Sequence, residues 1–126
     1  MRTLESLYWL GVKFSKEDTP ALSLGQWYPY ENTTELTAME SIQQVLQYMD
    51  ECELDELSAS TGILIAPGYE FKMVSGLITN FHQPGSTLIL LVAAFIGENW
   101  RNIYHHALSN NYRFLSYGDS SLLWRD

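Results

Sequence analysis

Residues 76–97 read GLITNFHQPGSTLILLVAAFIG, and this stretch decides what kind of fold the chain can form. Its start belongs to a predicted strand within residues 73–81. A hydroxyl at Ser86 or Thr87 can then cap a helix whose body, residues 88–96, is apolar on nearly every side and ends at a glycine. A strand that leads directly into a helix is typical of α/β folds, and we expect this helix to be buried almost all round.

The segments on either side continue the alternation of helix and strand. The expected elements are a helix over residues 3–13, a strand over 22–28 ending near Pro29, a helix behind a capping box of Thr37 and Glu40, a strand over 61–66, a helix over 100–108 closed by Asn110 and Asn111, and a final strand over 112–116. Together they predict an α/β layer with some parallel pairing, in which a partial sheet is flanked by helices.

The charge of the chain is distributed unevenly. The net charge is −8; residues 1–60 carry 11 acidic and 3 basic side chains, whereas residues 61–126 carry four of each. A general nucleic-acid binder needs a basic stripe to neutralise phosphates, and this sequence has none. If RNA is a partner, other parts of a larger protein must supply most of the phosphate contacts.

Composition excludes several further classes of protein. With 126 residues, 46% of them hydrophobic, the chain can form one globular domain or a piece of one. The lone Cys52 excludes a disulfide framework and a multi-cysteine zinc site. His105 and His106 are adjacent, so they diverge by about 100° on a helix and suit a solvated surface better than a metal. The sequence shows no signal peptide, and residues 88–96 are too short to span a membrane, so we expect a soluble, cytoplasmic protein without a metal cofactor.

The first candidate site is the polar cluster in residues 79–87, between the predicted strand and the apolar helix. His82 lies beside a helix N-terminus, where it can be held neutral or donate a proton near pH 7. Asn80 offers a donor and an acceptor, and Ser86 and Thr87 add hydroxyls. The structural alternative is that these side chains only cap the backbone of a tight turn and the helix, and the pattern alone leaves both interpretations open.

The second candidate site is the segment of residues 112–119. Asp119 can accept hydrogen bonds from ligand hydroxyls or an exocyclic amine, Tyr117 offers a stacking surface, and Arg113 can hold a carboxylate or phosphate. The structural alternative is a glycine-containing turn that Asp119 caps, with Arg113 paired to acidic surface.

The ordered set of motifs in the chain resembles one enzyme family. It consists of Ala66-Pro67-Gly68-Tyr69, Thr79-Asn80-Phe81-His82, Pro84, Ser86-Thr87-Leu88, Tyr112-Arg113-Phe114 and Tyr117-Gly118-Asp119, with Arg2-Thr3-Leu4-Glu5-Ser6 near the start. These motifs resemble the C-terminal region of the S-adenosylmethionine:tRNA ribosyltransferase-isomerases of queuosine biosynthesis. The sequence departs from the family pattern at Gln83, where leucine is usual, and at Gly85, where a charged residue is usual.

The resemblance implies that the chain is a fragment of a larger α/β domain. Residues 1–126 would be the C-terminal part of the catalytic domain, without most of that domain and without the family's inserted β-barrel. Residues 16–58 are acidic and fit the family least well. Apolar surface left uncovered by the missing part would favour self-association, and the isolated fragment is expected to be inactive.

The resemblance also implies a reaction. The family transfers the ribosyl group of S-adenosylmethionine to 7-aminomethyl-7-deazaguanine at the tRNA wobble position and isomerises it to epoxyqueuosine. S-adenosylmethionine is then the ribosyl-donor substrate, and tRNA binds through the full-length protein. The expected catalytic residues are His82 and Asp119, and the expected substrate-binding residues are Asn80, Phe81, Ser86, Thr87, Arg113 and Tyr117. The competing hypothesis is a non-catalytic or degenerate α/β module that binds a protein partner.

Overall fold

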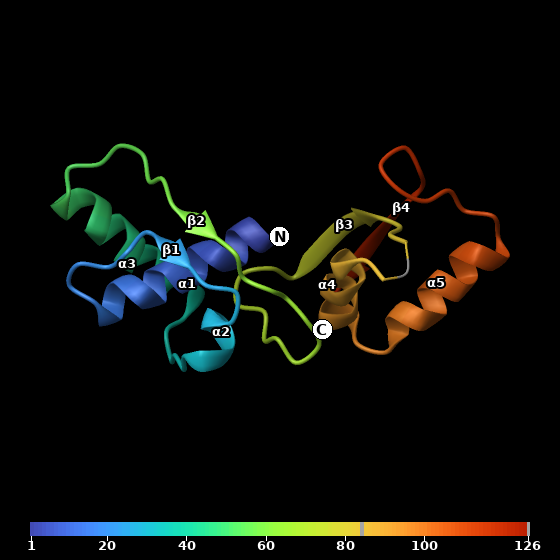
Figure 1. Ribbon diagram of the computed structural model, residues 1–126, viewed down its shortest axis with the longest axis horizontal. Coiled ribbons are helices and arrows are strands. Elements are labelled where there is room, and N and C mark those ends of the chain that lie inside the picture. The colour runs from blue at the N-terminus through green and yellow to red at the C-terminus, as the bar shows by residue number, and fades with distance from the viewer. Residues whose placement is uncertain (84, 126) are drawn as a thin grey trace. The chain divides into compact units, whose positions relative to one another are not determined.

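The structure is a computed structural model that describes residues 1–83 and 85–125, so Pro84 and Asp126 lie outside the described residues. The chain divides into two compact units, Met1–Leu64 with Lys72–Val74 and Ile65–Phe71 with Ser75–Asp126. In chain order the elements are α1 (Arg2–Lys16), β1 (Ser23–Leu24), α2 (Tyr28–Glu31), α3 (Ala38–Glu51), β2 (Ser60–Thr61), β3 (Gly76–Asn80), α4 (Thr87–Ile96), α5 (Asn99–Ser109) and β4 (Ser120–Trp124) (Figure 1).

The first unit is built on the packing of α1 against α3. The two helices meet where Gly11 of α1 faces Ser41 of α3, so closely that a β-carbon on Gly11 would overlap Ser41. Ser41 is fully buried, and its hydroxyl donates a hydrogen bond to the carbonyl oxygen of Tyr8 at 2.5 Å. The expected cap of α3 is confirmed, because the Thr37 hydroxyl accepts a hydrogen bond from the Glu40 N–H at 3.2 Å.

The sheet of the first unit is smaller than the sequence predicts. β1 and β2 are parallel but pair only Ser23 with Ser60 and Leu24 with Thr61. The predicted strand over residues 22–28 is wrong beyond residue 24, since Tyr28–Glu31 forms the short helix α2 with a proline in its first turn. The predicted strand over residues 61–66 is also wrong in extent. Its apolar side chains Ile63 and Ile65 are buried, as expected of a strand. Beyond Thr61, however, the backbone does not form a regular ladder, and the segment is joined to its neighbour by a hydrogen bond from the Leu64 N–H to the Gln26 carbonyl.

The second unit contains the antiparallel pair of β3 and β4, whose register runs from Gly76 opposite Trp124 to Asn80 opposite Ser120. The predicted strand within residues 73–81 is therefore confirmed as β3. On one face of the pair Ile78 and Leu122 are exposed, whereas Leu123 on the other face is buried. The pairing of this sheet is antiparallel, and the expected parallel pairing is found between β1 and β2.

The predicted final strand over residues 112–116 is wrong. This segment is a loop in which Leu115 has a positive φ of 69°, and the last strand is β4 instead. The loop is fastened to the end of β3 by a hydrogen bond from the Leu115 N–H to the Phe81 carbonyl at 2.9 Å. The aromatic side chains of Tyr112 and Phe114 pack against the Phe81 ring, so their alternation reflects packing around one ring and not sheet pairing.

The helices of the second unit begin and end where the sequence predicts. The Ser86 hydroxyl caps α4 by accepting a hydrogen bond from the Leu88 N–H at 3.1 Å, and Gly97 ends the helix with φ 66°. Asn111, with φ 56°, lies just beyond the end of α5 as expected of a left-handed cap. The prediction that α4 is buried almost all round is wrong, because Leu88 and Leu90 are exposed. In the described part of the chain, no helix has the length and apolar character needed to cross a membrane.

Candidate functional site

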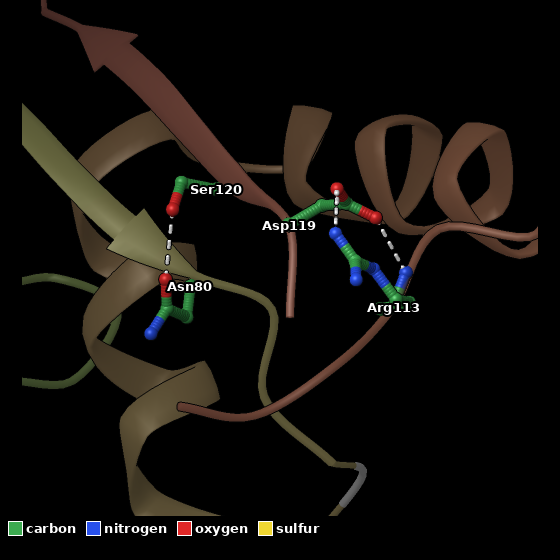
Figure 2. A network of polar contacts seen from close by, with 4 residues as sticks. All are labelled: Asn80, Arg113, Asp119 and Ser120. Carbon is green, nitrogen blue, oxygen red and sulfur yellow. Dashed lines mark hydrogen bonds and ion pairs between the residues drawn. The ribbon is translucent and has the colours of Figure 1, made fainter. Parts of the chain in front are cut away.

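The end of the β3–β4 pair carries a polar cluster formed by residues from both strands (Figure 2). Asn80 is the last residue of β3, and Ser120, opposite it, is the first residue of β4. The Ser120 hydroxyl donates a hydrogen bond to Asn80 Oδ1 at 2.8 Å. Asn80 Nδ2 lies 3.5 Å from the Ser116 carbonyl oxygen, a long hydrogen bond that fixes which way the amide faces. Asn80 is therefore oriented by strand pairing and remains only partly buried.

Asp119, next to Ser120, is held by Arg113 through both backbone and side chain (Figure 2). Asp119 Oδ2 accepts a hydrogen bond from the Arg113 N–H at 2.7 Å, and the Asp119 N–H donates to the Arg113 carbonyl oxygen at 2.9 Å. The guanidinium Nη2 lies 3.6 Å from Asp119 Oδ1. The hydrogen bond from the Arg113 backbone, followed by the nearby guanidinium charge, holds the pKa of Asp119 below its ordinary value, so the carboxylate is ionised at neutral pH.

His82 lies two residues beyond Asn80 and has its own partners. Its Nε2 is 3.0 Å from the Thr79 hydroxyl, and its backbone N–H donates to the Tyr104 hydroxyl at 2.9 Å. The imidazole is partly buried, and burial lowers its pKa below the ordinary value of 6.5. His82 is therefore mainly neutral at pH 7 and able to accept a proton.

An aromatic cluster supports the backbone that carries these groups. Phe81 is 2% exposed and has ring contacts with Tyr104, Tyr112 and Phe114 at centroid distances of 5.4, 5.8 and 5.5 Å. Because Phe81 lies between Asn80 and His82, this packing fixes the point where β3 ends and its polar side chains diverge. A burial penalty also raises the pKa of Tyr104, so its hydroxyl stays protonated.

The structure brings some of the predicted site residues together and leaves others apart. Arg113 and Asp119 form one pair, and Asn80 forms another with Ser120, the residue that follows Asp119. His82 lies two residues beyond Asn80 at the same end of the β3–β4 pair. Ser86 uses its hydroxyl to cap α4, Thr87 is exposed in the first turn, and Tyr117 is 97% exposed. The sequence argument missed Ser120, which connects the strands, because its role depends on a register that local patterns do not reveal.

Comparison with known proteins identifies the family. Residues 32–123 match the family model described as Queuosine biosynthesis protein. The chain belongs to this family. The family resemblance expected from the motifs is therefore confirmed.

Individual relatives carry the name of the enzymes that the motifs resemble. A protein of Xanthomonas oryzae named S-adenosylmethionine:tRNA ribosyltransferase-isomerase is 44% identical over 93 residues, covering 73% of this chain and 26% of the relative. One of Agrobacterium fabrum with the same name is 59% identical over 69 residues, covering 54% of this chain and 19% of the relative. A crystal structure of S-adenosylmethionine tRNA ribosyltransferase from Thermotoga maritima is similar, with 40% identity and a TM-score of 0.50, covering 64% of this chain and 30% of that one.

The matches extend over a limited part of each relative. The chain spans about a fifth to a quarter of the length of the curated relatives it matches.

Proposed function

We propose that this chain forms part of the substrate site of an S-adenosylmethionine-dependent tRNA ribosyltransferase-isomerase of queuosine biosynthesis. The observation that carries the proposal is the family match over residues 32–123, which includes both polar clusters. The names of the relatives supply the activity, and the short coverage of those relatives supports the view that the chain corresponds to one part of such an enzyme. The motifs imply that this is the C-terminal part of an α/β catalytic domain.

The proposed reaction moves the ribosyl group of S-adenosylmethionine onto the amine of 7-aminomethyl-7-deazaguanine at the tRNA wobble position. The ribosyl group then rearranges to an epoxycyclopentanediol, and adenine and methionine are released. The positive sulfonium of the donor acidifies the protons on the adjoining carbon, so the reaction needs a positioned base. Adenine departs more readily when it is protonated, so it also needs a proton donor.

His82 suits both requirements. Because burial lowers its pKa, the imidazole is mainly neutral at pH 7 and can accept the proton from the carbon beside the sulfonium. The resulting imidazolium can then protonate the departing adenine. The hydrogen bonds to Thr79 and Tyr104 hold the ring and the backbone of His82 in place.

The remaining residues would bind and orient the substrates. The ionised Asp119 can accept hydrogen bonds from ribose hydroxyls or an exocyclic amine, and Asn80 can both donate and accept. Thr87 and Tyr117 are exposed and available, whereas Ser86, Phe81 and Arg113 would act largely through the backbone or the neighbours that they already contact. With a net charge of −8, the chain leaves most tRNA phosphate contacts to the rest of a full-length protein.

The test is to exchange the matching segment of the Agrobacterium fabrum relative for this chain and to measure adenine release from S-adenosylmethionine with acceptor tRNA. We expect turnover in the exchanged protein. His82→Ala should reduce it by about a hundredfold or more, since general acid–base groups contribute factors of this size. His105→Ala is the matched control, because His105 is an exposed histidine on α5, and turnover should be unchanged.

Two outcomes would contradict the proposal. Near-normal turnover of the His82→Ala protein would remove His82 from the catalytic residues. A folded exchanged protein that binds S-adenosylmethionine in calorimetry but releases no adenine would favour the non-catalytic module, for which the acidic residues 1–60 offer a docking surface.

A further inference from the structure

The hydroxyl of Thr79 connects the end of β3 to the imidazole of His82. Thr79 Oγ1 lies 3.0 Å from His82 Nε2 and donates a hydrogen bond to the Asn80 carbonyl oxygen at 3.3 Å. A threonine hydroxyl has one proton to donate and two lone pairs that accept, so both contacts can be made together in only one sense. The hydroxyl gives its proton to the Asn80 carbonyl and accepts the proton that His82 carries on Nε2.

This arrangement fixes the tautomer of the neutral imidazole. A neutral imidazole carries one proton, and the hydrogen bonds of the ring indicate which nitrogen holds it. With the proton on Nε2, Nδ1 keeps its lone pair. Among the residues that the structure describes, none makes a hydrogen bond to His82 Nδ1, and the side chain is only partly buried. Nδ1 is therefore the ring nitrogen that is left for a substrate.

The pairing of β3 with β4 holds Thr79 in this position. Thr79 lies opposite Ser121, whose hydroxyl donates a hydrogen bond to the Thr79 carbonyl oxygen at 3.3 Å. Asn80, the next residue of β3, is held through its side chain by the Ser120 hydroxyl (Figure 2). The carbonyl that receives the Thr79 proton thus belongs to a paired strand, so the direction of the hydroxyl is set by regular backbone.

We propose that Thr79 is a positioning residue for His82 and that His82 Nδ1 is the nitrogen that takes the substrate proton. This assignment rests on the proposed function, in which His82 is the base. The Nδ1 lone pair forms a bond to a proton of the carbon beside the sulfonium, and the electron pair of the broken C–H bond stays on that carbon. The ring is then an imidazolium with a proton on each nitrogen. The Nδ1 proton passes to the departing adenine, and the ring returns to its starting tautomer.

The Thr79 hydroxyl suits both protonation states of the ring. It accepts the Nε2 proton before and after the transfer, so no hydrogen bond has to break as charge develops. Hydrogen bonds to an ionised group are stronger than those between neutral groups, so this contact strengthens when the imidazolium forms. Serine would retain the acceptor, whereas valine has nearly the same shape as threonine and lacks it.

The first test reads the tautomer directly in the 126-residue chain. Long-range proton–nitrogen NMR spectra, recorded where the ring is neutral, distinguish a protonated ring nitrogen from one with a free lone pair. We expect His82 to be protonated on Nε2 and free on Nδ1. In Thr79→Val the Nε2 proton loses its acceptor, and Nδ1 should carry the proton in part of the molecules. His105, an exposed histidine on α5, is the internal control and should not change with the substitution.

The second test measures adenine release in the exchanged protein made with the Agrobacterium fabrum relative. Thr79→Val should lower kcat about tenfold, the scale of one hydrogen bond, and leave KM for S-adenosylmethionine unchanged. Thr79→Ser should keep near-normal kcat, because it keeps the hydroxyl. Thr33→Val is the matched control, since Thr33 is an exposed threonine of the first unit, and it should change neither constant.

Three results would overturn the proposal. These are a proton on His82 Nδ1 in the unmodified chain, a normal kcat in Thr79→Val, and an equal loss of kcat in Thr79→Ser and Thr79→Val. The last result would assign the effect to packing and not to the hydroxyl. The NMR measurement needs no turnover, so its failure is separable from failure of the proposed reaction. The expected tautomer in an exchanged protein that releases no adenine would retain the contact with Thr79 and reject the reaction.

Discussion

The two compact units each contain a carboxylate that accepts a backbone N–H at 2.7 Å, but at different depths in the protein. In the first unit Glu5 is completely buried, and its two oxygens accept hydrogen bonds from the N–H groups of Lys72 and Met73, both at 2.7 Å. In the second unit Asp119 accepts one N–H from Arg113, and its side chain remains 39% exposed. The carboxylate is thus buried in the first unit and accessible to solvent in the second.

This difference indicates where a substrate can act. In the first unit, Glu5 and Ser41 are fully buried, and both make hydrogen bonds to backbone groups. The polar groups of the second unit, Asn80, His82 and Asp119, keep exposed surface and hydrogen-bonding capacity after their internal contacts are made. Polar side chains that are buried with their hydrogen bonds made are typical of the structural core. Polar side chains that are oriented by hydrogen bonds and still partly exposed are typical of a binding or catalytic site.

Replacing each carboxylate by alanine is the strongest test of this contrast. Glu5→Ala leaves two partly buried N–H groups without their acceptor, and we expect it to lower the free energy of unfolding by about 3 kcal/mol. Asp119→Ala should cost much less, because water can reach the Arg113 N–H that it releases. Urea denaturation followed by circular dichroism measures both, and equal losses would show that burial does not separate the two carboxylates.

The packing of the first unit predicts the next largest effect. Gly11→Ala would force a β-carbon into Ser41 and separate α1 from α3, at a packing cost of about 1–3 kcal/mol. Most of this range exceeds the roughly 1 kcal/mol gained in helix propensity, so we expect a net loss of stability. Gly25→Ala is the matched control, since a β-carbon there meets no neighbour within 4 Å. Thermal denaturation of both variants checks the prediction, and a Gly11→Ala protein as stable as the control would mean that the helices can move apart freely.

The sequence predicts correctly those helix ends that are set by contacts between residues close together in the chain. The Ser86 cap, the glycine that ends α4 and the left-handed Asn111 each depend on a side chain and its immediate neighbours, so the sequence reveals them. His82 and Asp119 could be named as candidate site residues for a similar reason, because residue type and position at the end of an apolar segment can be read from the sequence.

Non-local pairing accounts for the errors. Tyr112 and Phe114 alternate as a strand would, yet their rings pack on Phe81, and the strand that pairs with β3 is the less distinctive segment at residues 120–124. The contact between Ser120 and Asn80 follows from that register alone. The shape of the candidate site therefore depends on contacts between residues about 40 positions apart in sequence, which no local pattern encodes.

The smallest expected effect is the contribution of His82 to the pH dependence of the free energy of unfolding. Burial lowers its pKa in the folded protein below the ordinary 6.5, so between these two values the unfolded chain binds more protons than the folded one. The contribution of His82 is therefore fully present above pH 6.5 and is lost as the pH falls toward the folded pKa. Urea denaturation across this range, compared between the unmodified protein and His82→Gln, should show a shallower pH dependence in the variant, whereas His105→Gln should not change it. A His82 contribution that grows as the pH falls would mean that the imidazolium is stabilised in the folded state, and the neutral base assigned to this end of the β3–β4 pair would then be wrong.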